Sequence, residues 1–329
     1  MKARDSVKNY PSALREMTNY SSRGIKKICT EVGPRPCASE QEFEAQKRMA
    51  AELEQCCDSV QVEEFKTRPN AITFSLIAFF VSAIAMLIFL NFDLIVPFLV
   101  FCGLTMVILF TTVANKSIFA PFFPKKTSHN IIGIKKPEDY VASRRIIFSA
   151  YCDSTSKKNP AKGSIGANRN LSGCFAAISV VKFLQRQEIK LENTEIWILL
   201  TGSRNVESAG ALAFAKNHKF DDMETIFVGL DTLYDPNAIS VASGDESVYQ
   251  LVCQAATTAN CDFNLADLSK DTKEVAKKGI KAVCIGANGN STLDSKTDNA
   301  DSLNLNAIET CIDLALETAF LYDSKGLTL

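Results

Sequence analysis

Two long apolar runs interrupt an otherwise mixed pattern of polar and apolar positions. Residues 71–90 and 94–114 contain no charged side chain, and only Asn91, Phe92 and Asp93 separate them. A run of about 20 residues spans the roughly 30 Å hydrocarbon core of a membrane at 1.5 Å per residue. A single run of this kind can be a buried core helix, but two in tandem are hard to bury in a chain of 329 residues. The pattern therefore predicts a transmembrane helical hairpin.

The remaining sequence alternates between short β-branched runs and segments with helical periodicity. A capping-box pattern, Ser39-Glu40-Gln41-Glu42, predicts a helix start, and Val60 and Val62 indicate a strand. Beyond the second run, the expected strands are 130–134, 145–150, 195–201, 225–230, 239–242 and 282–286, and the expected helices are 172–187, 208–218, 247–259, 271–277 and 305–323.

This rhythm predicts an α/β domain with a mostly parallel sheet and helices on both faces. Residues 1–70 and 115–329 are expected to form this one discontinuous domain, and residues 71–114 the transmembrane hairpin. In such sheets the functional groups lie at the carboxyl ends of the strands. The loops after residues 150, 201, 230 and 286 are therefore the candidates for a functional site.

Charge and cysteine content restrict the partners and the compartment. The chain carries 36 Lys and Arg against 37 Asp and Glu, without the concentrated basic surface that a nucleic-acid partner requires. Its eleven cysteines are scattered and lack a Cys-x-x-Cys pair, which favours a reducing compartment. The turn of the predicted hairpin, residues 91–93, contains no basic residue. The basic residues that flank the hairpin are Lys66, Arg68, Lys116, Lys125 and Lys126. The positive-inside rule thus predicts an integral membrane protein, with the lipid membrane as a partner and the soluble domain facing the cytoplasm.

Several motifs share the order found in one enzyme family. The first motif is Gly-Pro-Arg-Pro at residues 33–36, within the stretch ICTEVGPRPCASEQEFEAQKRMAAEL. The second is Ser128-His129-Asn130-Ile131-Ile132-Gly133. The third, at residues 166–173, is Gly-Ala-Asn-Arg-Asn-Leu-Ser-Gly. Together they resemble the co-catalytic zinc aminopeptidases of metallopeptidase family twenty-eight, relatives of glutaminyl cyclases. The resemblance implies a zinc aminopeptidase-like α/β fold over nearly the whole soluble part, with the hairpin as an insertion.

The resemblance also implies a site with two zinc ions, five ligands and a glutamate base, and this chain departs from that pattern. The family's His-x-Asp corresponds to Tyr151-Cys152-Asp153, so the histidine ligand is replaced and the orienting aspartate is kept. The aspartate that bridges the two metals corresponds to Arg169. Di-zinc sites need carboxylates to neutralise the metal charge, whereas an arginine adds to it.

The later motifs depart in the same way. The Glu-Glu pair, base followed by ligand, corresponds to Arg204-Asn205, which leaves a cation at the base position. Asp231 matches the ligand after the fourth strand, and Asp294 stands where the family has its last histidine. The chain has only two histidines: His129 lies on an expected strand that is far from the ligand loops in sequence, and His218 is expected at the exposed end of a helix. No catalytic residue and no cofactor are therefore expected.

The former metal positions predict an Arg–Asp network in which guanidinium groups replace the zinc ions. Two alternatives are that these loops have diverged without mutual contact, or that they form a basic pocket for a peptide carboxylate or another anion. Cys152 lies next to the lost ligand, but no histidine is near it in sequence and an inert thiol is expected.

Two function classes follow. The first is a membrane-anchored pseudopeptidase that acts by binding or scaffolding, including a form that pairs with an active paralogue. The second is a metallo-hydrolase or aminopeptidase with a remodelled centre, in which Asp153, Asp231 and Asp294 hold one divalent metal ion. A centre with only oxygen ligands suits Mg²⁺, Mn²⁺ or Ca²⁺ better than zinc.

Overall fold

Contacts divide the chain into two units, residues 1–65 with 128–329 and residues 66–127. The computed structural model describes residues 2–113, 117–137, 139, 141–154, 165–235, 239–287 and 298–327. Within these ranges the first unit contains an eight-stranded sheet in the order β1-β2-β4-β3-β5-β8-β6-β7. Its strands are β1 (Ser59–Thr67), β2 (Lys126–Lys135), β3 (Arg144–Tyr151), β4 (Thr194–Thr201), β5 (Glu224–Leu230), β6 (Ile239–Ser243), β7 (Asn264–Leu265) and β8 (Lys281–Ala287).

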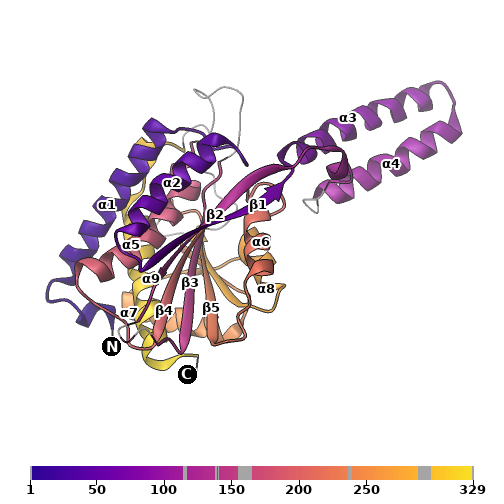
Figure 1. Cartoon of the computed structure of the whole chain (residues 1–329). Coiled ribbons are helices and arrows are strands. Elements are labelled where there is room, and N and C mark those ends of the chain that lie inside the picture. The colour runs from indigo at the N-terminus through magenta and orange to yellow at the C-terminus, as the bar shows by residue number, and fades with distance from the viewer. Residues whose placement is uncertain are drawn as a thin grey trace. The chain divides into compact units, whose positions relative to one another are not determined.

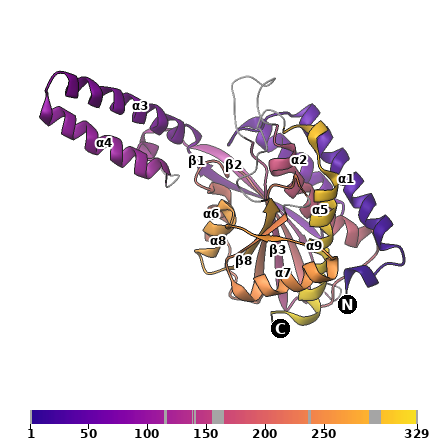
Figure 2. The same ribbon diagram turned by 180° about the vertical axis from the view of Figure 1, so that it is seen from behind.

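Helices cover both faces of this sheet (Figures 1 and 2). One face carries α1 (Tyr10–Glu31), α2 (Glu40–Glu54), α5 (Ser172–Arg186), α7 (Glu246–Ala259) and α9 (Leu305–Lys325). The other face carries α6 (Ala209–Asn217) and α8 (Lys270–Ala276). The α/β architecture with helices on both faces, predicted from the sequence, is confirmed.

The larger layer buries the more apolar helices. In α5 every residue from Ser172 to Leu184 is buried, because the helix lies between the sheet and helices α1 and α9. A helix that is apolar on all sides needs such a position. Helix α1 was not predicted from the sequence, although it buries Leu14, Met17, Ile25 and Ile28 at helical spacing.

Strand register brings four loops to one edge of the sheet. β3 pairs in parallel with β4 and β5, and β5 pairs in parallel with β8. Tyr151 at the end of β3 is the register partner of Thr201 at the end of β4, and Leu230 in β5 is the partner of Ile285 in β8. The segments that follow these strands therefore start side by side, at the carboxyl edge expected for a functional site.

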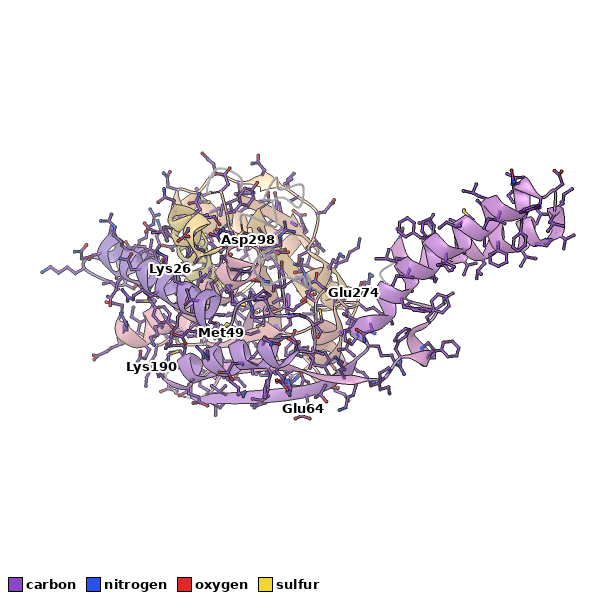
Figure 3. All side chains as sticks on the ribbon, turned by 90° about the horizontal axis from the view of Figure 1, so that it is seen from above. Lys26, Met49, Glu64, Lys190, Glu274 and Asp298 are labelled. Atoms are coloured by element: carbon purple, nitrogen blue, oxygen red, sulfur yellow. The ribbon has the colours of Figure 1, made fainter. Side chains whose placement is uncertain are left out.

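The second unit contains two helices, α3 (Pro69–Asn91) and α4 (Ile95–Val113), which pack against each other. Both are long and apolar enough to cross a membrane. In the most apolar 18-residue stretch of each helix, only 12% of α3 and 11% of α4 is buried. A core helix of a soluble protein would bury most of that surface. Instead, apolar side chains project outward from both helices (Figure 3). The hydroxyl oxygens of Ser82 and Thr105 lie 2.9 Å apart between the helices, a polar contact typical of helix pairs in membranes.

The two histidines belong to the first unit, His129 on β2 and His218 after α6. His129 on β2 stacks on Phe43 at 3.8 Å between ring centroids. His218 follows α6 and was expected to be exposed, but it is half-buried against Phe214, and its Nε2 lies 3.5 Å from a carboxylate oxygen of Glu63. His129 adjoins the loop after β4 through its backbone, because a Cβ at Gly202 would lie 2.5 Å from the His129 carbonyl oxygen, while its ring packs on Phe43.

Candidate functional site

Arg204 is the centre of the cleft at the carboxyl edge. Its guanidinium donates two hydrogen bonds to Asp231, at 2.7 and 3.3 Å, and its Nε lies 3.8 Å from an oxygen of Asp271. The same guanidinium stacks on the Tyr151 ring, with its carbon 3.9 Å from the ring centroid. Burial disfavours a charged guanidinium, but the two carboxylates hold the pKa of Arg204 above its ordinary value.

Asp153 is held by the backbone of the same loop. Its carboxylate accepts the Arg204 backbone N–H at 2.8 Å, the Asn205 backbone N–H at 3.0 Å and the Asn205 side-chain amide at 2.7 Å. The Cys37 thiol donates to the same carboxylate at 3.0 Å. Residue 204 thus joins two aspartates, Asp153 through its backbone and Asp231 through its side chain.

The left-handed backbone conformation of one residue, Ser203, makes these hydrogen bonds possible. Ser203 has φ of 53°, which turns three consecutive N–H groups toward the carboxylates of Glu42 and Asp153. Such a concave run of backbone N–H groups is a common anion-binding arrangement. A non-glycine residue in this conformation costs about 1 kcal/mol or more, so the two carboxylates must compensate for it.

Tyr151 and Arg169 are joined through the backbone. The Tyr151 hydroxyl donates to the Arg169 carbonyl oxygen at 2.8 Å, and the Thr232 hydroxyl donates to the same oxygen at 3.1 Å. Burial raises the pKa of Tyr151, while the nearby charges of Arg204 and Arg169 lower it by less. The Arg169 guanidinium is half-buried in a π-helical turn, Ala167–Leu171, at the start of α5.

A buried arginine, Arg35, donates hydrogen bonds to the loops of the site. Arg35, in the Gly-Pro-Arg-Pro turn, is 0% exposed, and it donates to the carbonyl oxygens of Cys152, Gly33 and Ile165 and to the side-chain oxygen of Asn170. The Asn170 amide nitrogen in turn donates to the Asp153 carbonyl at 2.6 Å. Burial lowers the pKa of Arg35, and the nearby cysteines and Asp153 offset this only in part. Arg35 therefore fixes the position of the β3 loop with neutral acceptors.

Two acidic residues of the site were missed from the sequence. Glu42 was interpreted as a helix-capping residue, and Ser39 does cap α2, but the Glu42 carboxylate is buried and accepts from Ala38, Ser128 and Ser203. Burial and the charge of Asp153 raise the pKa of Glu42 to about 8. Asp271 was predicted only as the start of a helix. It accepts from Thr201 at 2.9 Å, and burial raises its pKa although Arg204 opposes this.

The structure therefore brings together Tyr151, Asp153, Arg169, Arg204, Asn205 and Asp231, and Asp294 lies outside the described residues. The hollow lined by Tyr151, Arg204, Asp231 and Asp271 leaves about 10 Å³, the limit for one water molecule. Within the described ranges, no group of three or more His, Cys, Asp or Glu side chains is placed to hold a metal ion.

The scaffold beneath this cleft matches a known family. The model of peptidase family M28 matches residues 130–319, more than half of the chain. The chain belongs to peptidase family M28. The family predicted from the motifs is thus confirmed. No curated protein sequence matches the chain.

Solved structures show the same M28 fold. An aminopeptidase from Aneurinibacillus sp. strain AM-1 has a TM-score of 0.67 at 12% identity, covering 93% of this chain and 95% of that one. A zinc aminopeptidase from Bacillus subtilis has a TM-score of 0.67 at 13% identity, with the same coverage. A glutaminyl cyclase from Bacteroides thetaiotaomicron has a TM-score of 0.64 at 16% identity, covering 92% of this chain and 97% of that one. At these identities the similarity shows the fold alone.

Proposed function

We propose that this M28 protein is a membrane-anchored pseudopeptidase, which acts by binding or scaffolding and not by peptide-bond hydrolysis. The observation that carries the proposal is the position of the Arg204 guanidinium, which is paired with Asp231 and stacked on Tyr151 in the cleft. Arg204 stands where the family has its general base, and a guanidinium stays protonated and cannot take a proton from water.

A di-zinc centre does not fit the residues of this cleft. Both oxygens of Asp231 accept from Arg204, and both oxygens of Asp153 accept from the loop at 204–205. An arginine replaces the bridging carboxylate at position 169. At ~4 Å and an effective dielectric constant of ~20, two unit charges repel by about 4 kcal/mol, and a divalent ion doubles that figure. A metal ion would have to displace the internal cation first.

Metal analysis and activity assays on the purified full-length protein test this proposal. We expect no stoichiometric Zn²⁺, Mn²⁺ or Mg²⁺, and the same background rate on aminoacyl p-nitroanilides for the wild-type protein and Asp231→Asn, with or without chelator. Glutaminyl cyclisation is measured in parallel. Stoichiometric metal, together with chelator-sensitive hydrolysis that Asp231→Asn abolishes, would instead establish the remodelled hydrolase with one metal at Asp153, Asp231 and Asp294.

The anchoring part of the proposal rests on α3 and α4. Both helices have the length and apolar surface of membrane spans, and basic residues flank the hairpin in the sequence, whereas its turn contains none. We propose that both helices cross the membrane and that the first unit, residues 1–65 with 128–329 and here called the M28 unit, faces the cytoplasm. Resistance to alkaline carbonate extraction tests the insertion. Labelling of Asn91→Cys, but not of the wild-type protein, by an impermeant maleimide from outside intact cells tests the orientation. Labelling of the wild-type protein from outside, through the cysteines of the first unit, would reverse it.

The partner in this proposal is a peptide chain end or another anion, attracted by the positive charges at positions 169 and 204. Because Arg204 is already paired with Asp231, a bound carboxylate has to exchange for Asp231. Peptides with free and amidated C-termini, compared by thermal shift, separate this binding mode from nonspecific binding. Pairing with an active paralogue is the scaffolding form of the proposal. It predicts that a chain with the missing histidines co-purifies with this one.

A further inference from the structure

The segment that follows α4 combines aromatic and basic residues. Residues 117–126, here called the post-hairpin segment, read SIFAPFFPKK and include a short 3₁₀ turn, Ala120–Phe122. Phe122 is 84% exposed, Phe119 and Phe123 are half-buried, and Lys125 and Lys126 are exposed. An exposed phenylalanine beside two lysines is an amphipathic combination of the kind found where a chain lies at a membrane surface.

Hydrogen bonds tie this segment to the start of α3. The Ser117 hydroxyl lies 2.6 Å from the Ser75 hydroxyl and donates to the Ala71 carbonyl at 3.0 Å. At the other end of the segment, Arg68 Nε donates to the Phe123 carbonyl at 3.2 Å. These contacts fix the backbone of the post-hairpin segment against the first two turns of α3.

Aromatic packing fixes the segment from the side. The ring of Phe74 on α3 meets Phe119 at 5.1 Å and Phe123 at 5.2 Å between centroids. Phe122 is left pointing outward, since it is the most exposed of the segment's rings. The segment thus presents an apolar ring from a fixed backbone at one end of the hairpin.

Positive charge collects at the same end. Among the described residues from 66 to 127 the basic side chains are Lys66, Arg68, Lys125 and Lys126, and the one acid, Asp93, lies beyond the far end of α3. A 23-residue helix separates the two ends by about 35 Å. Lys66 is held in place by a hydrogen bond from its amine to the Thr127 hydroxyl at 2.6 Å.

We propose that the post-hairpin segment lies along the membrane–water interface, and that Lys66, Arg68, Lys125 and Lys126 form a binding surface for the phosphate-bearing headgroups of anionic phospholipids. The inference rests on the proposed membrane insertion of α3 and α4. Aromatic side chains favour the headgroup level, and basic side chains near it attract anionic lipids. A soluble polyanion would satisfy the lysines but leave Phe122 in water, so the combination favours a lipid surface.

A single-tryptophan reporter tests this inference, because Trp197 is the one tryptophan of the chain. The variant Trp197→Phe/Phe122→Trp is reconstituted in vesicles of phosphatidylcholine and phosphatidylglycerol. Bromine is placed on the chains of one lipid or the other, near the headgroup or deep in the bilayer. We expect shallow bromine to quench more than deep bromine, and brominated phosphatidylglycerol to quench about twofold more than brominated phosphatidylcholine.

Charge variants test whether Lys125 and Lys126 produce the preference for phosphatidylglycerol. Lys125→Gln/Lys126→Gln should bring the ratio of the two quenching values close to one, whereas Lys277→Gln/Lys278→Gln, an exposed lysine pair in the M28 unit, should leave it unchanged. Equal quenching by both lipids in the reporter protein would refute the headgroup surface.

Carbonate extraction of the same vesicles separates this inference from the proposed function. A carbonate-resistant protein whose reporter tryptophan is not quenched would refute the interfacial position alone. Release of the protein by carbonate would refute the membrane insertion itself.

Discussion

Two arginine clusters stand at opposite edges of the same sheet and are built from the same parts. At the carboxyl edge Arg204 joins two carboxylates and stacks on Tyr151, the last residue of β3. At the amino edge Arg145, near the start of β3, also joins two carboxylates and stacks on an aromatic ring, that of Trp197 at 4.6 Å.

The clusters differ in how much water reaches the carboxylates. Asp222, the bidentate partner of Arg145, is 54% exposed, whereas the side chains of Asp231 and Asp271 are 16% and 10% exposed. Accordingly, Arg145 lowers the pKa of Asp222, while burial raises the pKa of Asp271. At the amino edge Asp222 can return to water when it loses its arginine, although Glu195 is only 13% exposed, whereas in the cleft both carboxylates are shielded. In our interpretation, Arg204 therefore serves as a fixed internal counter-ion of the M28 cleft.

The largest expected effect comes from removing that counter-ion. Arg204→Met leaves Asp231 and Asp271 without a cation in a poorly hydrated cleft, so the M28 unit should lose about 3 kcal/mol of unfolding free energy. Urea unfolding of the full-length protein in detergent, followed by far-UV circular dichroism, measures the loss. Arg204→Lys, which keeps the charge but not the planar fork, should lose less. A wild-type midpoint for Arg204→Met would contradict the role assigned to Arg204.

Glu42 gives the cleft a pH dependence in the range above neutrality, whereas the pKa of Asp222 at the amino edge is shifted downward. Its folded pKa of about 8 lies above its unfolded value, so the folded state binds the extra proton. The resulting stability is present at low pH and is lost as the pH rises toward the folded pKa. Between pH 6 and pH 8 the wild-type protein should lose about 2 kcal/mol more than Glu42→Gln.

Urea midpoints at the two pH values measure this difference. Glu40→Gln, at an exposed position of the same helix, is the matched control and should keep the wild-type pH dependence. Parallel pH profiles for the wild-type protein and Glu42→Gln would show that the Glu42 carboxyl does not titrate in this range.

At the amino edge the same kind of truncation should cost less. Arg145→Met removes the partner of Asp222, which regains water, and of Glu195, which keeps the hydrogen bond from Trp197 Nε1 at 2.8 Å. We expect a loss of about 1–1.5 kcal/mol, roughly half of that for Arg204→Met. Both variants are compared in one urea series. An equal or larger loss for Arg145→Met would remove the distinction between the two edges.

The sequence predicted part of the cleft cluster and did not single out the Arg145 cluster. Local periodicity was sufficient to predict most strands and helices. Motif positions were sufficient to place Arg204 and Asp231 in the site, because each follows a strand whose end is clear in the sequence. Asp271 and Glu42 were missed because both reach the cleft from helices, and their partners, Thr201 and Ser203, are 70 and 161 residues away. Helical spacing describes a residue's own element, not the distant loop that its carboxylate meets.

The smallest expected effect tests whether water and ions weaken the attraction between Arg145 and the exposed Asp222. Asp222→Asn removes one exposed charge from the Arg145 cluster, and at physiological salt it should cost less than about 0.5 kcal/mol, since water and ions already screen that attraction. Because Arg145 lowers the folded pKa of Asp222, the difference should be present near pH 7 and vanish as the pH falls through that pKa. Asp221→Asn removes the same charge from the neighbouring exposed position and is the control in the same urea series. A loss for Asp222→Asn near that of Arg204→Met would mean that exposure does not distinguish the two clusters, and the difference in hydration could no longer explain the role of Arg204.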